Sequence, residues 1–319
     1  MVSEYSRQRP ISGQQIHLAA GDYEADIATV GASLRTLTYR GRDLVAPFDA
    51  EALRPVYRGA VLVPWPNRIA DGRYIFDGAQ QQIAINEPER RTALHGLAVW
   101  ADWTVASADA ASAVLEYRIP AQEAYPFDVL VSASYRLDAG GLHWSVRATN
   151  LGDARAPYGL GSHAYLVAGP GRVDDWTLTV PADQVLEVTA DRLLPVGTRL
   201  VDSFEGGVLD FRGARAIEKT FIDHAFTGVT ADESGVARVE VRSASGAGVA
   251  MVWDPVALPW VQVHTADRPE PELDRSGLAV EPMTCPPDAF NSGEDLIVLE
   301  PGASHEASWQ IHALARDDE

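Results

Sequence analysis

Glu281 opens the stretch EPMTCPPDAFN (281–291), in which a carboxylate stands directly before a proline. Because proline restricts the preceding residue to extended backbone, we expect Glu281 to end the short apolar run at 277–280 and to point off a strand tip. The two prolines at 286–287 disfavour a helix directly after it. A carboxylate held at this place could accept a proton, and an exposed strand-end carboxylate is the simpler alternative.

His163 lies in the most apolar and glycine-rich surroundings of any histidine in the sequence, YGLGSHAYL (158–166). Burial would lower its pKa and a neighbouring carboxylate would raise it, so a value suited to a general acid is attainable. The alternative is a packed histidine without chemistry. Ser162 is not the nucleophile of a GxSxG hydrolase motif, because Leu160 and Ala164 occupy the positions of the glycines.

Two further stretches could bind a ligand rich in hydroxyl groups. In PWPNRIADGR (64–73), Asn67 and Arg68 follow a rigid proline-led segment, where Trp65 offers a flat apolar face and Arg68 several fixed donors. In LHG (94–96), the glycine after His95 permits close backbone approach. The alternatives are an arginine paired with a surface acid and a core histidine bonded to a backbone carbonyl.

The run IDHAF (222–226) places Asp223 and His224 inside an apolar, strand-like segment. Neighbouring side chains of a strand point to opposite faces, so we expect no more than one of the two in a site. Asp223 could accept hydrogen bonds from ligand hydroxyls. A solvent-facing aspartate is the alternative.

Other chemistries find little support. His95, His163 and a carboxylate could form a His₂Glu zinc site, but no HExxH or other local zinc spacing occurs, so we expect no metal. Phosphate loops of the GxxxxGK[ST] and GxGxxG types are absent, and we expect no nucleotide cofactor. The single cysteine, Cys285, excludes an internal disulfide; we interpret it as a small buried hydrophobe rather than a nucleophile.

Charge and hydropathy restrict the partners. The chain has 26 Lys and Arg against 45 Asp and Glu, a net charge of −19, which argues against nucleic acids and anionic membranes and weakly against phosphorylated substrates. Lys219 is the only lysine, and the arginines could still build a local anion site. No apolar run approaches the roughly 18 residues of a membrane span, and the N-terminus lacks an apolar signal region. We therefore expect a cytoplasmic protein. We also expect it to be a monomer or a weak homodimer.

The elements that must position these residues are strands. Residues 73–85 form a predicted hairpin around Asp77-Gly78, and 127–137 pairs with 142–148 in a second, strongly alternating hairpin. Runs at 236–242 and 249–253 repeat the pattern. Helical patterns are scarce, with single turns conceivable at 121–125 and near 214. Strands every 8 to 12 residues predict an all-β fold, one large antiparallel β-sandwich domain over residues 1–319.

Taken together and in this order, five motifs resemble the aldose 1-epimerase (galactose mutarotase) family. They are NRI with ADGRY (67–74), LHG (94–96), GSHAYL (161–166), IDHAF (222–226) and EPMTCPPDAFN (281–291), and the resemblance extends from GASLRTL near 31 to LEPG at 299–302. It implies a supersandwich that binds a pyranose without a cofactor. It also implies roles for the matching residues: Glu281 as base, His163 as acid, His95 and Arg68 as polarising or positioning donors, and Asp223 as a contact to ring hydroxyls. We also expect Asn67 to bind the substrate.

The sequence departs from the galactose enzymes at VQVHTAD (261–267), where they commonly carry a YTGN-like stretch, and at LAVWADW (97–103) after the first histidine. The aldose is therefore open. A neutral sugar fits the net charge. A hexose 6-phosphate would need arginines near the mouth of the site, with Arg40, Arg42, Arg73, Arg90 and Arg91 as candidates. A non-catalytic sugar-binding domain of the same fold is the third alternative.

Overall fold

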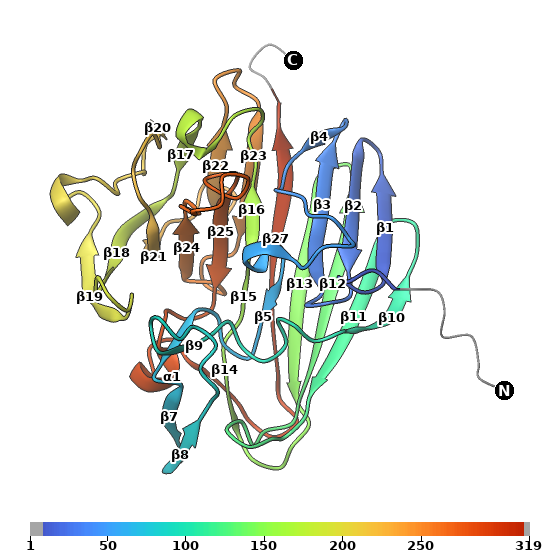
Figure 1. The fold of residues 1–319 in the computed structure, drawn as a ribbon, viewed down its shortest axis with the longest axis vertical. Helices are drawn as coiled ribbons and strands as arrows, with labels where there is room; N and C mark the ends of the chain where they lie inside the picture. Colours follow the sequence, from blue (N-terminus) through green and yellow to red (C-terminus); the bar gives the residue numbers. More distant parts are fainter. Residues whose placement is uncertain (1–8, 316–319) are drawn as a thin grey trace.

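The computed structural model describes residues 9–315, and nearly all of its regular structure is antiparallel β-sheet (Figure 1). The larger sheet contains nine strands. In spatial order they are β10 (Thr104–Ala108), β11 (Ser112–Ile119), β12 (Val129–Asp138), β13 (Gly141–Asn150), β27 (Ser304–Leu314), β23 (Gly248–Trp253), β22 (Ala237–Arg242), β17 (Thr177–Thr179) and β20 (Arg215–Ala216). The predicted hairpin β12–β13 is confirmed, with Asp138 paired to Gly141 across the turn and buried residues alternating along both strands.

The second sheet contains eight strands and carries the candidate site. Its order is β19 (Pro195–Leu200), β18 (Ala182–Val188), β21 (Asp223–Val229), β24 (Trp260–His264), β25 (Leu278–Met283), β15 (Gly161–Ser162) and β5 (Val61–Leu62), with β16 (Ala164–Leu166) also paired to β25. One face of β24 and β25 adds Val261, Val263 and Val280 to the main hydrophobic core. Because all six residues of β25 are buried, its other face is covered as well.

Smaller elements complete the fold. A four-stranded sheet contains β1 (Gln15–Ala20), β2 (Tyr23–Ala28), β3 (Ser33–Tyr39) and β4 (Arg42–Asp43). Three strand pairs are β14 (Ala156–Tyr158) with β26 (Ile297–Leu299), β6 (Arg68–Ala70) with β9 (Thr92–Leu94), and β7 (Arg73–Phe76) with β8 (Ala79–Gln82). The last pair is the hairpin predicted around Asp77-Gly78. Three 3-10 turns lie at Pro55–Tyr57, Val173–Asp175 and Phe204–Gly206. Within residues 9–315, no helix has the length and apolar character needed to cross a membrane.

Three local expectations were wrong. Glu281 does not end a strand: β25 continues through it to Met283, and Glu281 is only 2% exposed. A single helical turn, α1 (Ala289–Ser292), follows the prolines at 286–287. It begins after them, so neither proline would have to donate a backbone N–H within the helix. The segments at 121–125 and near 214 are a turn and a bend, not helices.

Candidate functional site

The site is built on β25 and the interrupted strand beside it. β16 and β15 pair with β25 on either side of His163, in a single register that sets His163 directly opposite Glu281. On its other side Glu281 is paired with Gln262 of β24. Side chains that lie opposite one another in an antiparallel pair share a face, so all three project to the same side of the sheet.

Glu281 and His163 form a close, buried pair. Oε1 of Glu281 lies 3.5 Å from Nε2 of His163, and the two side chains are 2% and 6% exposed. Burial raises the pKa of Glu281 well above its usual value, and the charge of Asp223 adds to this shift while Arg68 opposes it. Burial lowers the pKa of His163 well below its usual value, and neighbouring His95 lowers it further. Oε2 of Glu281 and Nδ1 of His163 have no hydrogen-bond partner within residues 9–315.

A separate hydrogen-bonded row lies beside this pair and leads from Asn67 through Gln262 to Asp223. The Asn67 side chain donates to Oε1 of Gln262 at 3.3 Å, and Gln262 donates to Oδ1 of Asp223 at 2.8 Å. Burial raises the pKa of Asp223, but His264, Arg68 and the hydrogen bond from Gln262 outweigh it, so that the net shift is downward. Asp223 is therefore held as an ionised acceptor.

Strand alternation separates Asp223 from His224 as expected. Asp223 pairs with His264 on β24, and both line the same cavity. His224 lies outside that cavity and packs against Phe204.

Apolar side chains flank the polar row on both sides along the strands. Tyr165 and Ala279 belong to a small cluster on one side, and Trp260, Met283 and Ala225 belong to another on the opposite side. These clusters keep water away from both sides of Glu281, which lowers the local dielectric and accounts for the shifts of pKa there.

His95 and Asn67 cover the face from a second layer. Both have left-handed backbone, with φ of 65° and 56°. The backbone N–H of Asn67 donates to Nδ1 of His95 at 3.2 Å, so a neutral His95 carries its proton on Nε2. Gly96 allows this layer to approach, because a Cβ there would lie 2.0 Å from the Val63 carbonyl oxygen.

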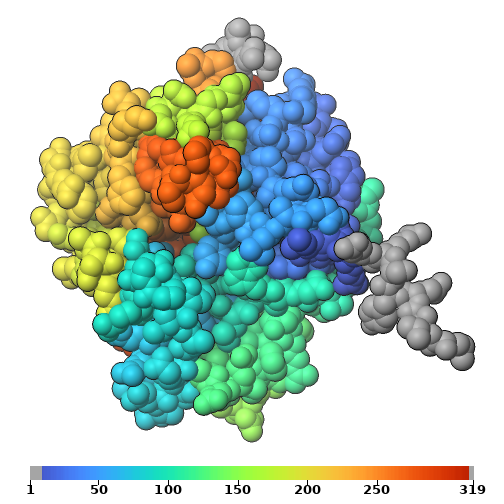
Figure 2. All heavy atoms as spheres, viewed as in Figure 1, coloured from blue at the N-terminus to red at the C-terminus, as the bar shows by residue number. Residues whose placement is uncertain are grey.

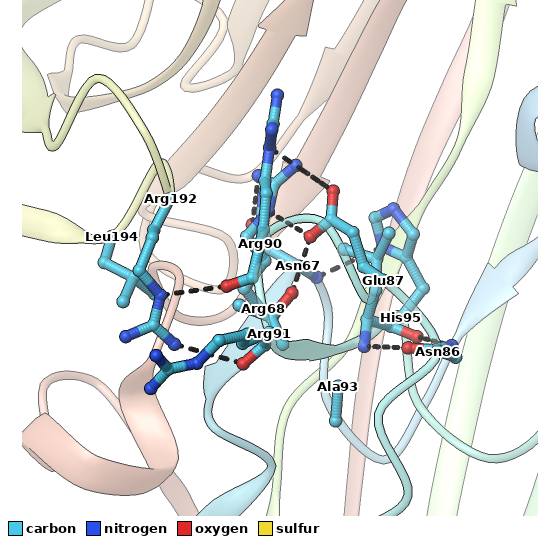
Figure 3. Close-up of polar contacts among 12 residues, drawn as sticks. Asn67, Arg68, Asn86, Glu87, Arg90, Arg91, Ala93, His95, Arg192 and Leu194 are labelled. Atoms are coloured by element: carbon cyan, nitrogen blue, oxygen red, sulfur yellow. Dashed lines mark hydrogen bonds and ion pairs between the residues drawn. The ribbon is translucent and has the colours of Figure 1, made fainter.

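Arg68 is fixed by a buried carboxylate rather than by a surface acid (Figure 3). Its Nε and Nη2 donate to the two oxygens of Glu87 at 2.8 and 2.9 Å, and both side chains are 10% exposed. Thr92 donates a further hydrogen bond to Glu87 at 2.5 Å. The guanidinium plane therefore has one orientation, which also brings Nη1 to 3.3 Å from the Asn67 amide oxygen.

Tyr57 packs over the two histidines. Its ring centroid lies 4.8 Å from that of His95 and 6.0 Å from that of His163, and Tyr165 stacks on His163 at 5.0 Å. Val56 and Tyr57 both have positive φ, 42° and 59°. A β-branched residue in this region is strained, so the surrounding structure enforces the position of Tyr57.

These side chains surround a cavity of about 170 Å³. In Figure 2 the surface is hollowed where the teal atoms of the 80–95 region meet the orange atoms of the 265–275 region. All six residues singled out from the sequence line it: Asn67, Arg68, His95, His163, Asp223 and Glu281. Trp65 does not; it is buried, and its ring packs on Phe290. Cys285 is also buried and lies outside the cavity.

Several lining residues were not predicted, among them Tyr57, Glu87, Gln262, His264 and Arg268. Gln262 and His264 come from the stretch 261–267, where the sequence departs from the galactose enzymes, and Arg268 follows directly after it. The alternation of VQVH would have placed Gln262 and His264 on one face. Tyr57 follows no periodic pattern, since a strained turn presents it. Among residues 9–315, no group of three or more His, Cys, Asp or Glu side chains is arranged to hold a metal ion.

The sequence model of the family described as aldose 1-epimerase matches residues 14–312. The chain belongs to the aldose 1-epimerase family. An uncharacterized relative, YihR of Escherichia coli K12, is 40% identical over 302 residues, 94% of each chain. The rat protein named galactose mutarotase is 29% identical over 217 residues, which cover 62% of this chain and 60% of the relative.

Solved structures of aldose 1-epimerase relatives share the fold. The GalM/aldose epimerase homologue from Caenorhabditis elegans has a TM-score of 0.81 at 21% identity and covers 95% of this chain and 99% of its own. The galactose 1-epimerase from Lactobacillus acidophilus has a TM-score of 0.78 at 18% identity, over 94% and 95%. The expected supersandwich architecture is thereby confirmed.

Proposed function

We propose that the protein is an aldose 1-epimerase that interconverts the α and β anomers of a pyranose, with Glu281 as the base and His163 as the acid. The observation that carries this proposal is the placement of a buried carboxylate and a buried imidazole 3.5 Å apart at the base of a cavity lined with hydrogen-bonding groups. Family membership supports the reaction class.

The reaction needs only these two groups to exchange protons with the sugar. The Glu281 carboxylate removes the proton from O1 while the His163 imidazolium protonates O5; the C1–O5 bond breaks and C1=O1 forms. Rotation about C1–C2 exposes the other face of the carbonyl. Reclosure returns both protons and gives the other anomer. Each positioned acid or base typically contributes about 10²- to 10⁴-fold.

The opposite pKa shifts of the two groups are compatible with this cycle. A carboxylate with an imidazolium and a carboxylic acid with a neutral imidazole contain the same single proton, so they are two forms of one protonation state of the pair. The first form opens the ring. The second form results from that step and is present while the sugar is the open-chain aldehyde. The pair therefore begins and ends each turnover with the same net charge.

Three other lining residues, His95, Arg68 and Asp223, would position the sugar ring. Neutral His95 would donate from Nε2, Arg68 would donate from a fixed guanidinium, and Asp223 would accept from ring hydroxyls. Asn67 and Gln262 join these groups in one hydrogen-bonded row, so they are set before the sugar arrives.

The test is anomer exchange measured by NMR for a panel of neutral and anionic aldoses, with wild type compared with Glu281→Gln and His163→Asn. We expect each substitution to lower kcat by about 10²-fold or more. The proposal is wrong if no sugar in the panel exchanges faster with wild type than with Glu281→Gln. Sugar binding by calorimetry without faster exchange would instead support a non-catalytic binding domain.

A further inference from the structure

Arg268 lines the cavity, and its guanidinium has no partner among residues 9–315. Its only hydrogen bond is donated by its backbone N–H to Asp274, and its side chain makes no hydrogen bond or ion pair within residues 9–315. Every other arginine in that range has such a partner for its guanidinium. In a protein of net charge −19, an arginine that no acid neutralises beside a cavity indicates a place for an anion.

Arg90 adds a second incompletely neutralised charge to the same rim. Its nearest acid is Glu87, whose Oε1 lies 3.4 Å from its Nε, but both oxygens of Glu87 are already engaged by Arg68. Figure 3 shows the Arg90 side chain extending beyond Glu87. One carboxylate thus serves two guanidiniums, and the Arg90 side chain remains 30% exposed.

The other carboxylates at the cavity do not cancel this charge. Asp267 is paired with Arg275 at 2.8 Å. Asp223 has a side chain that is only 14% exposed, and the charge of Arg68 acts on it. Glu89, which is exposed, is the one remaining acid on the rim of the described structure, against the two guanidiniums of Arg90 and Arg268.

The position of these arginines matches a particular part of a pyranose. The anomeric chemistry occupies the buried end, where His163 would protonate O5. C5 is bonded to O5 and bears the exocyclic carbon C6, so C6 projects from the His163 side of the ring. His163, Arg90 and Arg268 line the same cavity, so a group on C6 projects into the space that the two arginines border.

We propose that the natural substrate is an aldopyranose with an anionic group on its exocyclic carbon, bound by Arg268 and Arg90 at the rim of the cavity. This inference rests on the proposed function and decides between the neutral and the phosphorylated sugar that the sequence left open. The net charge favoured a neutral sugar. The local arrangement of charges is the more direct guide, because a ligand in the cavity meets the rim arginines at contact distance while most surface acids are screened.

The experiment compares kcat/KM for anomer exchange of glucose and galactose with that of glucuronate, glucose 6-sulfate and glucose 6-phosphate. These three differ in the shape and charge of the anion. We expect at least one anionic sugar to exceed both neutral sugars by about 10-fold or more, with a preference that weakens as salt is raised. Arg268→Gln should lower kcat/KM for that sugar by about 10-fold and leave the value for glucose within about two-fold. Arg90→Gln should act in the same direction.

The matched control is Arg91→Gln, which removes the same charge from the neighbouring position. Arg91 pairs with Asp71 and does not line the cavity, so both classes of sugar should be unaffected. Exchange of neutral sugars at least as fast as that of every anionic sugar would overturn the inference and leave the mutarotase proposal intact. An unchanged preference in Arg268→Gln would also overturn it. Failure of every sugar to exchange faster with wild type than with Glu281→Gln would overturn both proposals.

Discussion

Glu281 and His163 face each other across adjacent strands, with Oε1 and Nε2 3.5 Å apart. Both side chains are buried, and burial disfavours the charged form of each group. The pKa of the carboxyl is raised and that of the imidazole is lowered, both mainly by burial. The pair is therefore costly to ionise and sensitive to its surroundings.

Replacing Glu281 by Gln should stabilise the protein above pH 4.5. The folded state holds the Glu281 proton more tightly than the unfolded chain does, so wild-type stability falls as pH rises from the unfolded pKa of about 4.5 towards the folded pKa. The advantage of Glu281→Gln should grow by about 1.4 kcal/mol per pH unit in that interval and vanish below it. Urea unfolding from pH 4 to 8 measures this. Glu24→Gln, at an exposed position, is the control, and equal curves for the two variants would contradict the prediction.

The pH profile of kcat/KM should be bell-shaped, because activity follows the one-proton state of the Glu281–His163 pair. On the acid side, activity is lost when the pair takes up a second proton. That proton binds to His163, whose pKa is lowered, so the midpoint of the acid limb should lie below pH 6.5. Exchange of a sugar with no titrating group should therefore change little from pH 7 to 6. A midpoint of the acid limb above pH 6.5 would contradict this prediction, because it would mean that burial does not lower the pKa of His163.

Glu87→Gln should destabilise the fold by about 3 kcal/mol, because it leaves the buried Arg68 guanidinium without its charged acceptor. Equilibrium urea unfolding would measure the loss. The control is Glu306→Gln, which breaks the exposed pair with Arg147 and should cost less than about 1 kcal/mol. A similar small loss in both variants would mean that Arg68 finds another partner.

Cys285 should be unreactive in the folded protein. Burial raises the pKa of its thiol to about 12, so almost no thiolate exists at pH 8. An aromatic disulfide reagent should therefore label it only after denaturation, and Cys285→Ala should retain wild-type kcat. Rapid labelling of the native protein together with loss of activity would restore the nucleophile alternative.

Tyr57 should matter through its ring and not through its hydroxyl. Tyr57→Phe preserves the packing on His95 and His163 and should keep kcat within about two-fold. Tyr57→Ala should lower kcat by about 10-fold, since both imidazoles gain freedom to rotate. An equal loss in the two variants would assign the effect to the hydroxyl.

The strands and six of the residues that line the cavity could be predicted from the sequence, because both depend on local patterns. The alternation in β12 and β13 sets the hairpin, and Asp223 faces the cavity while His224 does not, as period two requires. The six polar residues selected for their surroundings converge on one cavity, although their separation in the chain reaches 214 positions.

The depth of the site could not be predicted, because it depends on pairing between distant strands. The proline after Glu281 suggested the end of a strand, whereas β25 continues past it beside a partner strand that is interrupted at His163. Tyr57 and Arg268 are presented by irregular segments, and the carboxylate opposite Arg68 is buried only because residues 86–94 fold back on β6. No local signal encodes these contacts.

The register of β25 restricts insertions and deletions in this strand. Glu281 shares its face with Gln262 and His163 only while the number of residues in the strand is kept, since inserting or deleting one would turn the carboxylate into the hydrophobic core. The connecting segments at the rim carry no such restriction. We therefore expect changes at Arg90 and Arg268 to alter substrate preference and to leave the Glu281–His163 pair in place, so that chemistry and selectivity could be engineered separately.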